Sequence, residues 1–277
     1  MADWKNSICN QASTVAIADI NNYIDSLTIT ESPIDRFYQR RDEILRVATP
    51  NFATANPTVT PLLLVGLISI VENYYRDIIS SLIRICPLSK ESSSEKTINL
   101  ASVWFGSDNM EKGALENTSF SDSKNIAKNL LNIFGLNVEH ANNQISAPLA
   151  EFSKLCELRH AVVHSAGELS GKNAIKLQLS NSRAAVQVVL GYSEIQETAA
   201  ICTSLICASN LELFKLMASR WLHRWPSTPA YLGRNLNGLF KQVWTIFYSQ
   251  IDQTNGLISD SLTMVKARNQ VINTRAT

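Results

Sequence analysis

The chain has 277 residues, of which 45 % are hydrophobic and 18 % charged, and its formal net charge is +1. This composition supports a large buried core and excludes wholesale disorder, while the near-neutral charge gives no general attraction to nucleic acid. Any site for phosphate groups must therefore be a local concentration of Arg, Lys and His.

The first half of the chain is predicted to be helical, because Gly and Pro are scarce within its long periodic segments. A connector over 53–61 ends in a proline that suits the start of a helix, and Gly135 suits the end of one. The expected elements are, in chain order, helices over 3–27 and 33–48, a long helix from Pro61 to about Cys86, a solvated loop over 87–96, one or two short helices within 97–118 and a capped helix within 119–137.

The second half continues the helical pattern, with one interruption. Alternating apolar residues in 174–180 and 184–192, on either side of Asn-Ser-Arg, indicate a short β-hairpin. The sequence therefore predicts an α-helical protein with at most a short β-hairpin. The helices expected here are, in chain order, one over about 146–165 that ends at Gly167, one over 193–225 that ends at Pro226, one over about 234–252 and a weak terminal one.

A cytoplasmic protein without a membrane segment is expected. The N-terminal residues 1–11 are polar and unlike a signal peptide, and the longest apolar run, 61–71, is about half of a membrane span. The cysteines lack metal-ligand spacing and suit small core positions in a reducing compartment. They are Cys9, Cys86, Cys156, Cys202 and Cys207.

An arginine interrupts the apolar face of the helix expected over 146–165. With Phe152 at the centre of that face, Arg159 lies about 20° away at 100° per residue. A guanidinium keeps its proton, so at a buried position it needs a carboxylate, a ligand or an interface. His160 and His164 lie on the flank of the same helix, which makes this segment the candidate functional site.

Glu72 is the candidate carboxylate for this arginine, because it lies at the margin of the apolar stripe of the helix 61–86. Arg76, one turn further on, competes for it as an ordinary i,i+4 partner. The sequence alone leaves both pairings open.

Three chemistries could use these side chains. Glu157, His160 and His164 could bind a metal, although di-iron bundles need a second Glu-x-x-His that this chain lacks. Cys156 and His160 are spaced for thiol chemistry, but no third group orients them. The last option is cleavage of RNA without metal, in which His transfers protons, Arg159 stabilises charge on the phosphate, and the ribose 2′-hydroxyl attacks.

The segment from Arg159 to His164 resembles the R-x4-H signature of the HEPN family. The signature is followed here by Ser-Ala-Gly, His160 stands where the family often has Asn or Asp, and Glu72 matches an acidic residue of an earlier helix. The surrounding pattern is similar to the RiboL-PSP-HEPN subgroup over about 57–220. The resemblance implies a HEPN-type helical bundle over 57–225, with helical extensions over 1–56 and 226–277.

The resemblance further implies a metal-independent endoribonuclease that needs no cofactor and leaves a 2′,3′-cyclic phosphate. Arg159 and His164 would be catalytic, His160 supporting, and Glu72 would orient the arginine. The active form would be a homodimer with a composite site, acting as a toxin or in antiphage defence, with an antitoxin or other regulatory partner. Ala166 replaces a Tyr that toxins of this type carry, so regulation through that Tyr is not implied.

The alternative from another class is a non-catalytic HEPN-like module that binds RNA or protein, with Arg159 and Glu72 as a structural pair. A further candidate RNA contact is the segment 219–226, in which Arg220, His223 and Arg224 alternate with two Trp residues. The competing interpretation is a helix end with Trp in the core and cations near the C-terminal dipole.

Overall fold

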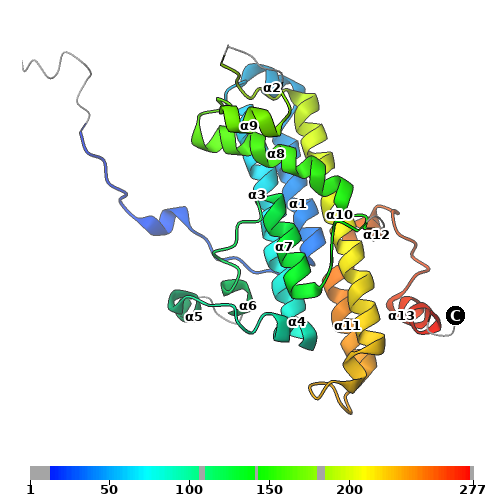
Figure 1. Ribbon diagram of the computed structural model, residues 1–277. Coiled ribbons are helices and arrows are strands. Elements are labelled where there is room, and N and C mark those ends of the chain that lie inside the picture. The colour runs from blue at the N-terminus through cyan, green and yellow to red at the C-terminus, as the bar shows by residue number, and fades with distance from the viewer. Residues whose placement is uncertain (1–12, 106–109, 141–142, 180–184, 275–277) are drawn as a thin grey trace, which may run out of the picture. The chain divides into compact units, whose positions relative to one another are not determined.

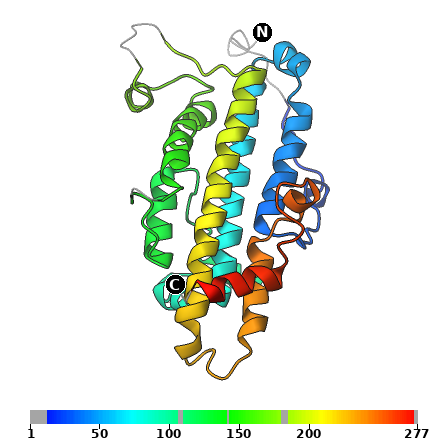
Figure 2. The same cartoon turned by 90° about the vertical axis from the view of Figure 1, so that its right-hand side faces the viewer.

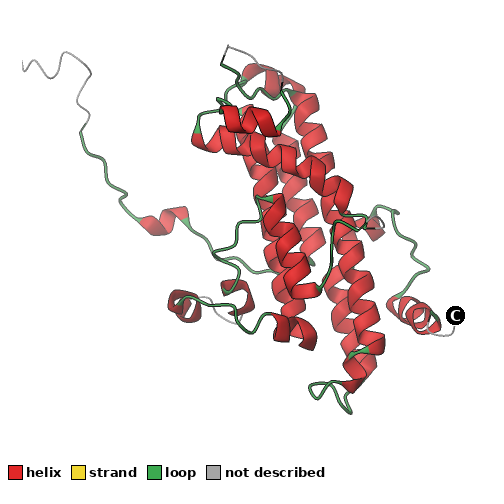
Figure 3. Cartoon of the chain, viewed as in Figure 1, coloured by secondary structure: helices red, strands yellow, loops and turns green. Residues whose placement is uncertain are grey.

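The computed structural model describes residues 13–105, 110–140, 143–179 and 185–274 (Figure 1). Helices dominate these residues, which contain no β-strand (Figure 3). Their one β-type feature is an isolated antiparallel bridge between Glu168 and Gln187. The expectation of an all-α protein is confirmed.

The chain divides into two compact units, residues 1–31 and 32–277. In the first unit, the described residues form one short 3-10 turn, Ile20–Tyr23, capped by the Asp19 carboxylate. The predicted helix over 3–27 is therefore wrong for residues 13–27, and residues 3–12 lie outside the described part. The apolar side chains of 13–29 are exposed, so no packing stabilises a helix there.

The second unit is a bundle built around two long helices, α3 (Thr60–Ile85) and α10 (Tyr192–His223). Figure 2 shows them side by side, with α1 (Pro33–Val47) on one side and α7 (Ser123–Phe134) and α8 (Ser146–His164) on the other. Near the C-terminus, α11 (Leu236–Phe247) packs on both long helices.

Helix α3 is the most buried element. Pro61 lies in its first turn and Pro87 follows its end, as the sequence predicts. Of its 26 residues, four are exposed. Its fully buried side chains, which face α1, α8 and α10, include Leu64, Leu67, Val71, Tyr75, Ile78, Ile79 and Leu82.

The three predicted domain segments contribute to one core, because α1 and α11 both pack on α3 and α10. The assignment of 57–225 as a HEPN-like domain, with 1–56 and 226–277 as its helical extensions, stays a prediction. Among the described residues, α10 alone is long and apolar enough to span a membrane by length and composition. A core helix meets the same criterion, and α10 contacts α1, α3, α8 and α11.

Short helices connect these elements. The prediction of one or two short helices within 97–118 is confirmed, since two form there. The loop predicted over 87–96 is wrong, because its first six residues form a helix with Ser89 buried. The single helix predicted over about 234–252 is broken at Tyr248.

The short helices of the bundle unit are α2 (Pro50–Ala55), α4 (Pro87–Ser92), α5 (Leu100–Phe105), α6 (Met110–Gly113), α9 (Gly171–Lys176), η3 (Trp225–Ser227), α12 (Gln250–Thr254) and α13 (Met264–Asn273).

The predicted β-hairpin is not formed. Its first segment, 174–180, begins inside α9, whose N-cap Ser170 accepts a hydrogen bond from the Asn173 backbone N–H. From its second segment, residues 186–188 pair instead with 167–169, directly after α8. Residues 180–184, the expected turn, lie outside the described residues. A local capping signal thus prevailed over an alternating pattern only seven residues long.

A buried carboxylate joins the two ends of the bundle unit. Asp35 of α1 is 5 % exposed and accepts hydrogen bonds from the Ser249 hydroxyl (2.6 Å) and the Gln250 backbone N–H (2.9 Å), at the start of α12. Together with the Tyr38 hydroxyl, which donates to the Asp252 carboxylate at 3.2 Å, Asp35 links α1 to the C-terminal segment.

We expect Asp35→Ala to lower the free energy of unfolding by about 2–3 kcal/mol, since it leaves buried donors of α12 without an acceptor. Urea titration monitored by circular dichroism measures the change. Asp42→Ala on the same helix is the matched control: its carboxylate is 43 % exposed and pairs with the neighbouring Arg41, so the change should stay below about 1 kcal/mol. An equal decrease in the free energy of unfolding of both variants would contradict the role given to Asp35.

Candidate functional site

The R-x4-H segment forms the last turns of α8, which ends at His164 as predicted. Gly167 has a φ of 93°, which favours glycine, and its N–H donates to the Ala161 carbonyl to close the helix end. The chain then turns into the short pairing with 186–188 and into α9. Local sequence therefore places Arg159, His160 and His164 at an exposed helix terminus.

The buried face of α8 rotates along the helix. Phe152 and Leu149 face the core in the first half, whereas Leu155, Val162 and Ala161 do so towards the end. At 100° per residue, the face of α8 that points to the core turns about the helix axis by roughly a quarter of a circle or more between these two parts. Val163 is 44 % exposed and Arg159 is half-buried, so the prediction that Arg159 lies near the centre of the buried face is wrong.

Glu72 pairs with Arg76 and forms neither a hydrogen bond nor an ion pair with Arg159. Its carboxylate lies 3.4 Å from the Arg76 guanidinium and accepts a hydrogen bond from the Phe120 backbone N–H at 2.9 Å. Of the two pairings left open by the sequence, the structure shows the i,i+4 pair. The orienting contact to Arg159 that the resemblance implies is therefore not made.

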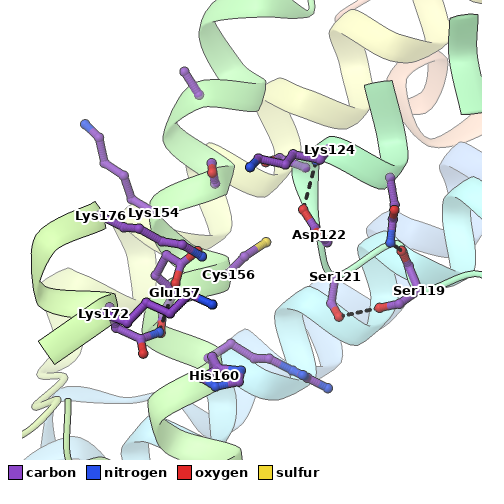
Figure 4. A pocket seen from close by; sticks show the side chains of 16 residues that line it. Ser119, Ser121, Asp122, Lys124, Lys154, Cys156, Glu157, His160, Lys172 and Lys176 are labelled. Carbon is purple, nitrogen blue, oxygen red and sulfur yellow. Dashed lines mark hydrogen bonds and ion pairs between the residues drawn. The ribbon is translucent and has the colours of Figure 1, made fainter. Parts of the chain in front are cut away.

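Arg159 lines a polar cleft between α8, α9 and the N-terminal end of α7. Figure 4 shows this cleft from close by. The Arg159 side chain forms no hydrogen bond or ion pair with any described residue. The cleft has a volume of about 640 Å³, and the described residues that line it carry five cations against two carboxylates. The cations are Lys124, Lys154, Arg159, Lys172 and Lys176, and the carboxylates are Asp122 and Glu157.

The four lysines of this cleft are absent from the sequence-based site. Lys172 and Lys176 are one helical turn apart in α9, but the sequence predicts a strand that begins at residue 174. Lys124 lies on a different helix, some 35 positions before the motif. The i,i+4 spacing of Lys172 and Lys176 was the one sequence feature that could have indicated a cationic helix face here. The β-type alternation of the following residues obscured it.

Helix α9 is fastened to α8 through Glu157. The Glu157 carboxylate accepts hydrogen bonds from the Asn173 side-chain amide at 2.9 Å and from the Lys176 ammonium. Asn173 is 3 % exposed and also donates to the Glu157 backbone carbonyl at 3.2 Å. These contacts fix the cationic face of α9 against the cleft, as Figure 4 shows for Glu157, Lys172 and Lys176.

The two imidazoles of the motif lie against each other. The ring centroids of His160 and His164 are 4.6 Å apart, and both residues are exposed. His160 lines the cleft, whereas His164 lies one turn further along α8. Both rings are open to a substrate or to a second molecule.

The other two chemistries find less support. Burial raises the pKa of the Cys156 thiol to about 12, which removes the thiolate near neutral pH. The Glu157 carboxylate is occupied by Asn173 and Lys176. Within the described residues, no three His, Cys, Asp or Glu side chains are grouped so that they could hold a metal ion.

The cationic segment at the end of α10 is divided between core and surface. Trp221 and Trp225 are buried, as the competing interpretation proposed. The Arg220 guanidinium donates to the Phe134 carbonyl at 2.6 Å and to the Ser89 hydroxyl at 3.0 Å, so it joins α10 to α7 and α4. The prediction that Arg220 contacts RNA is thereby corrected, whereas His223 and Arg224 are exposed and remain candidates.

Comparisons with models of protein families, with curated protein sequences and with solved structures gave no significant match to the chain.

We expect Arg220→Met to lower the free energy of unfolding by about 2–3 kcal/mol, because the acceptors on α7 and α4 lose a charged donor. Arg224→Met, at the exposed position one turn later, should change it by less than about 0.5 kcal/mol. Equilibrium urea unfolding of both variants gives the comparison. A fully stable Arg220→Met protein with weakened RNA binding would restore Arg220 as a nucleic-acid contact.

Proposed function

We propose that the chain is a metal-independent endoribonuclease of the HEPN type. The supporting observation is the end of α8, where the unpaired Arg159 guanidinium faces a cationic cleft and two exposed imidazoles follow it. A permanent cation that pairs with no described residue is suited to an anionic ligand, and phosphate is the group that such a cleft would attract.

The chemistry needs one base, one acid and one cation. A histidine takes the proton of the ribose 2′-hydroxyl, whose oxygen attacks the adjacent phosphorus. The bond from phosphorus to the 5′-oxygen breaks, and a second imidazole protonates that oxygen. Arg159 stabilises the additional negative charge on the phosphate. The products are a 2′,3′-cyclic phosphate and a 5′-hydroxyl, and DNA is spared because it lacks the attacking group.

His164 is the proposed catalytic histidine and His160 the supporting one. A homodimer would bring the ends of two α8 helices together, so that two arginines and four imidazoles surround one scissile phosphate. The exposure of His160, Val163 and His164 leaves this helix end free to meet a second copy. A role in toxicity or antiphage defence and a regulatory partner accompany this proposal on the strength of the resemblance. A cytoplasmic location accompanies it on the strength of the sequence features given above.

Purified protein should cleave total RNA or tRNA in the presence of EDTA, and His164→Ala should reduce the rate by about 10²–10⁴-fold. His140→Ala, another exposed histidine outside the cleft, is the matched control and should retain the parent rate. Product ends are tested for cyclic phosphate. Cleavage that survives in His164→Ala would contradict the proposal. A folded parent that binds RNA without cutting it would instead favour the non-catalytic module.

Arg159→Ala should reduce cleavage by about 10²–10³-fold and change the free energy of unfolding by less than about 1 kcal/mol. The reason is that this guanidinium has no described hydrogen-bond or ion-pair partner to leave behind. Activity and urea unfolding are measured on the same preparation. A stability loss of about 3–5 kcal/mol would show that Arg159 belongs to a buried ion pair and that its role is structural.

A further inference from the structure

Three unpaired cations from three helices meet at one cleft. Lys124 of α7, Arg159 of α8 and Lys172 of α9 all line it, and none of their side chains forms a hydrogen bond or ion pair with a described residue. Lys154 and Lys176, by contrast, pair with Glu151 and Glu157. Like charges held around one space repel each other, and an anion placed between them removes that cost.

The walls that carry these charges are held in place. Figure 4 shows Lys172 and Lys176 on one side of the cleft and Lys124 on the other. Asn173, buried next to Lys172, holds α9 to α8 through Glu157. Asp122 accepts a hydrogen bond from the Lys124 backbone N–H and so fixes the first turn of α7. The backbone positions of the two lysines are therefore set before any ligand arrives, while their exposed side chains reach towards the cleft.

The lining of the cleft selects a sugar-phosphate backbone over a base. Apart from the His160 imidazole, the described lining residues include no aromatic ring, and most of the others are serines, lysines and amides. Stacking on aromatic rings is the usual means of holding an unpaired base, whereas cations and hydroxyls hold phosphates. A ligand recognised here would contribute its phosphates and leave its bases outside.

We propose that this cleft binds the phosphodiester backbone of single-stranded RNA on Lys124 and Lys172, beside the phosphate that Arg159 holds. The inference rests on the proposed ribonuclease function and assigns its substrate-binding track. Lys124 and Lys172 bind and position the strand and take no part in bond cleavage. Recognition through phosphates makes the binding independent of base sequence and dependent on salt.

The test measures binding without cleavage, in the His164→Ala full-length protein, with labelled oligouridylates of one, three, six and twelve nucleotides. Fluorescence anisotropy at several KCl concentrations gives the slope of log K against log salt. Each phosphate contact on a single strand contributes about 0.7 to that slope. Adding Lys124→Gln and Lys172→Gln should therefore reduce its magnitude by about 1.4 and weaken binding of the twelve-nucleotide strand at least tenfold.

The matched control is Lys241→Gln with Lys266→Gln, which removes the same charge from exposed positions on α11 and α13, outside the cleft. It should leave the slope unchanged. A twelve-nucleotide oligothymidylate should show the same dependence on Lys124 and Lys172, because the contacts are to phosphates.

Three results of the binding experiment would overturn the assignment: no RNA binding by the His164→Ala protein at low salt, equal slopes in the cleft and control variants, or uridine monophosphate bound as tightly as the twelve-nucleotide strand. The last result would show that the cleft takes a free phosphorylated small molecule. The EDTA cleavage assay judges the ribonuclease proposal separately. Cleavage that needs His164 but is indifferent to both lysines would refute this inference alone.

Discussion

Burial of α3 is the constraint on which the rest of the bundle depends. The helix is apolar around most of its circumference, so only a narrow strip of its surface can face solvent. Each fully buried Leu or Ile contributes about 1.5–3 kcal/mol, provided that other helices cover it. Helices α1, α8 and α10 supply that cover, and their positions follow from the shape of the surface they enclose.

The position of the proposed site follows from the way in which α8 packs on this core. Its first half and its second half bury different faces, and this rotation moves Arg159 out of the core and into the cleft. The contacts of Glu157 with Asn173 then bring α9 and its lysines alongside. A near-neutral chain thus gathers positive charge in one place, which is the local concentration that its overall charge requires of any phosphate site.

The sequence predicted the elements whose limits are encoded locally. Pro61 and Pro87 limit α3, Gly135 and Gly167 end α7 and α8, and all of these limits are confirmed. Prediction failed where amphipathic pattern stood alone. The segment 13–27 has apolar residues but no partner to bury them, and 174–180 alternates like a strand although Ser170 caps a helix there.

By itself, the sequence determined the helical class, the helix that carries Arg159, His160 and His164, and the place where that helix ends. Propensity, proline and glycine act within a few residues, and that range suffices for such features. Only the tertiary structure decided that Glu72 pairs with Arg76, that Arg220 is a structural link, and that Lys124 and Lys172 face one cleft. These facts depend on which faces of distant helices meet, and burial of the shared core determines that.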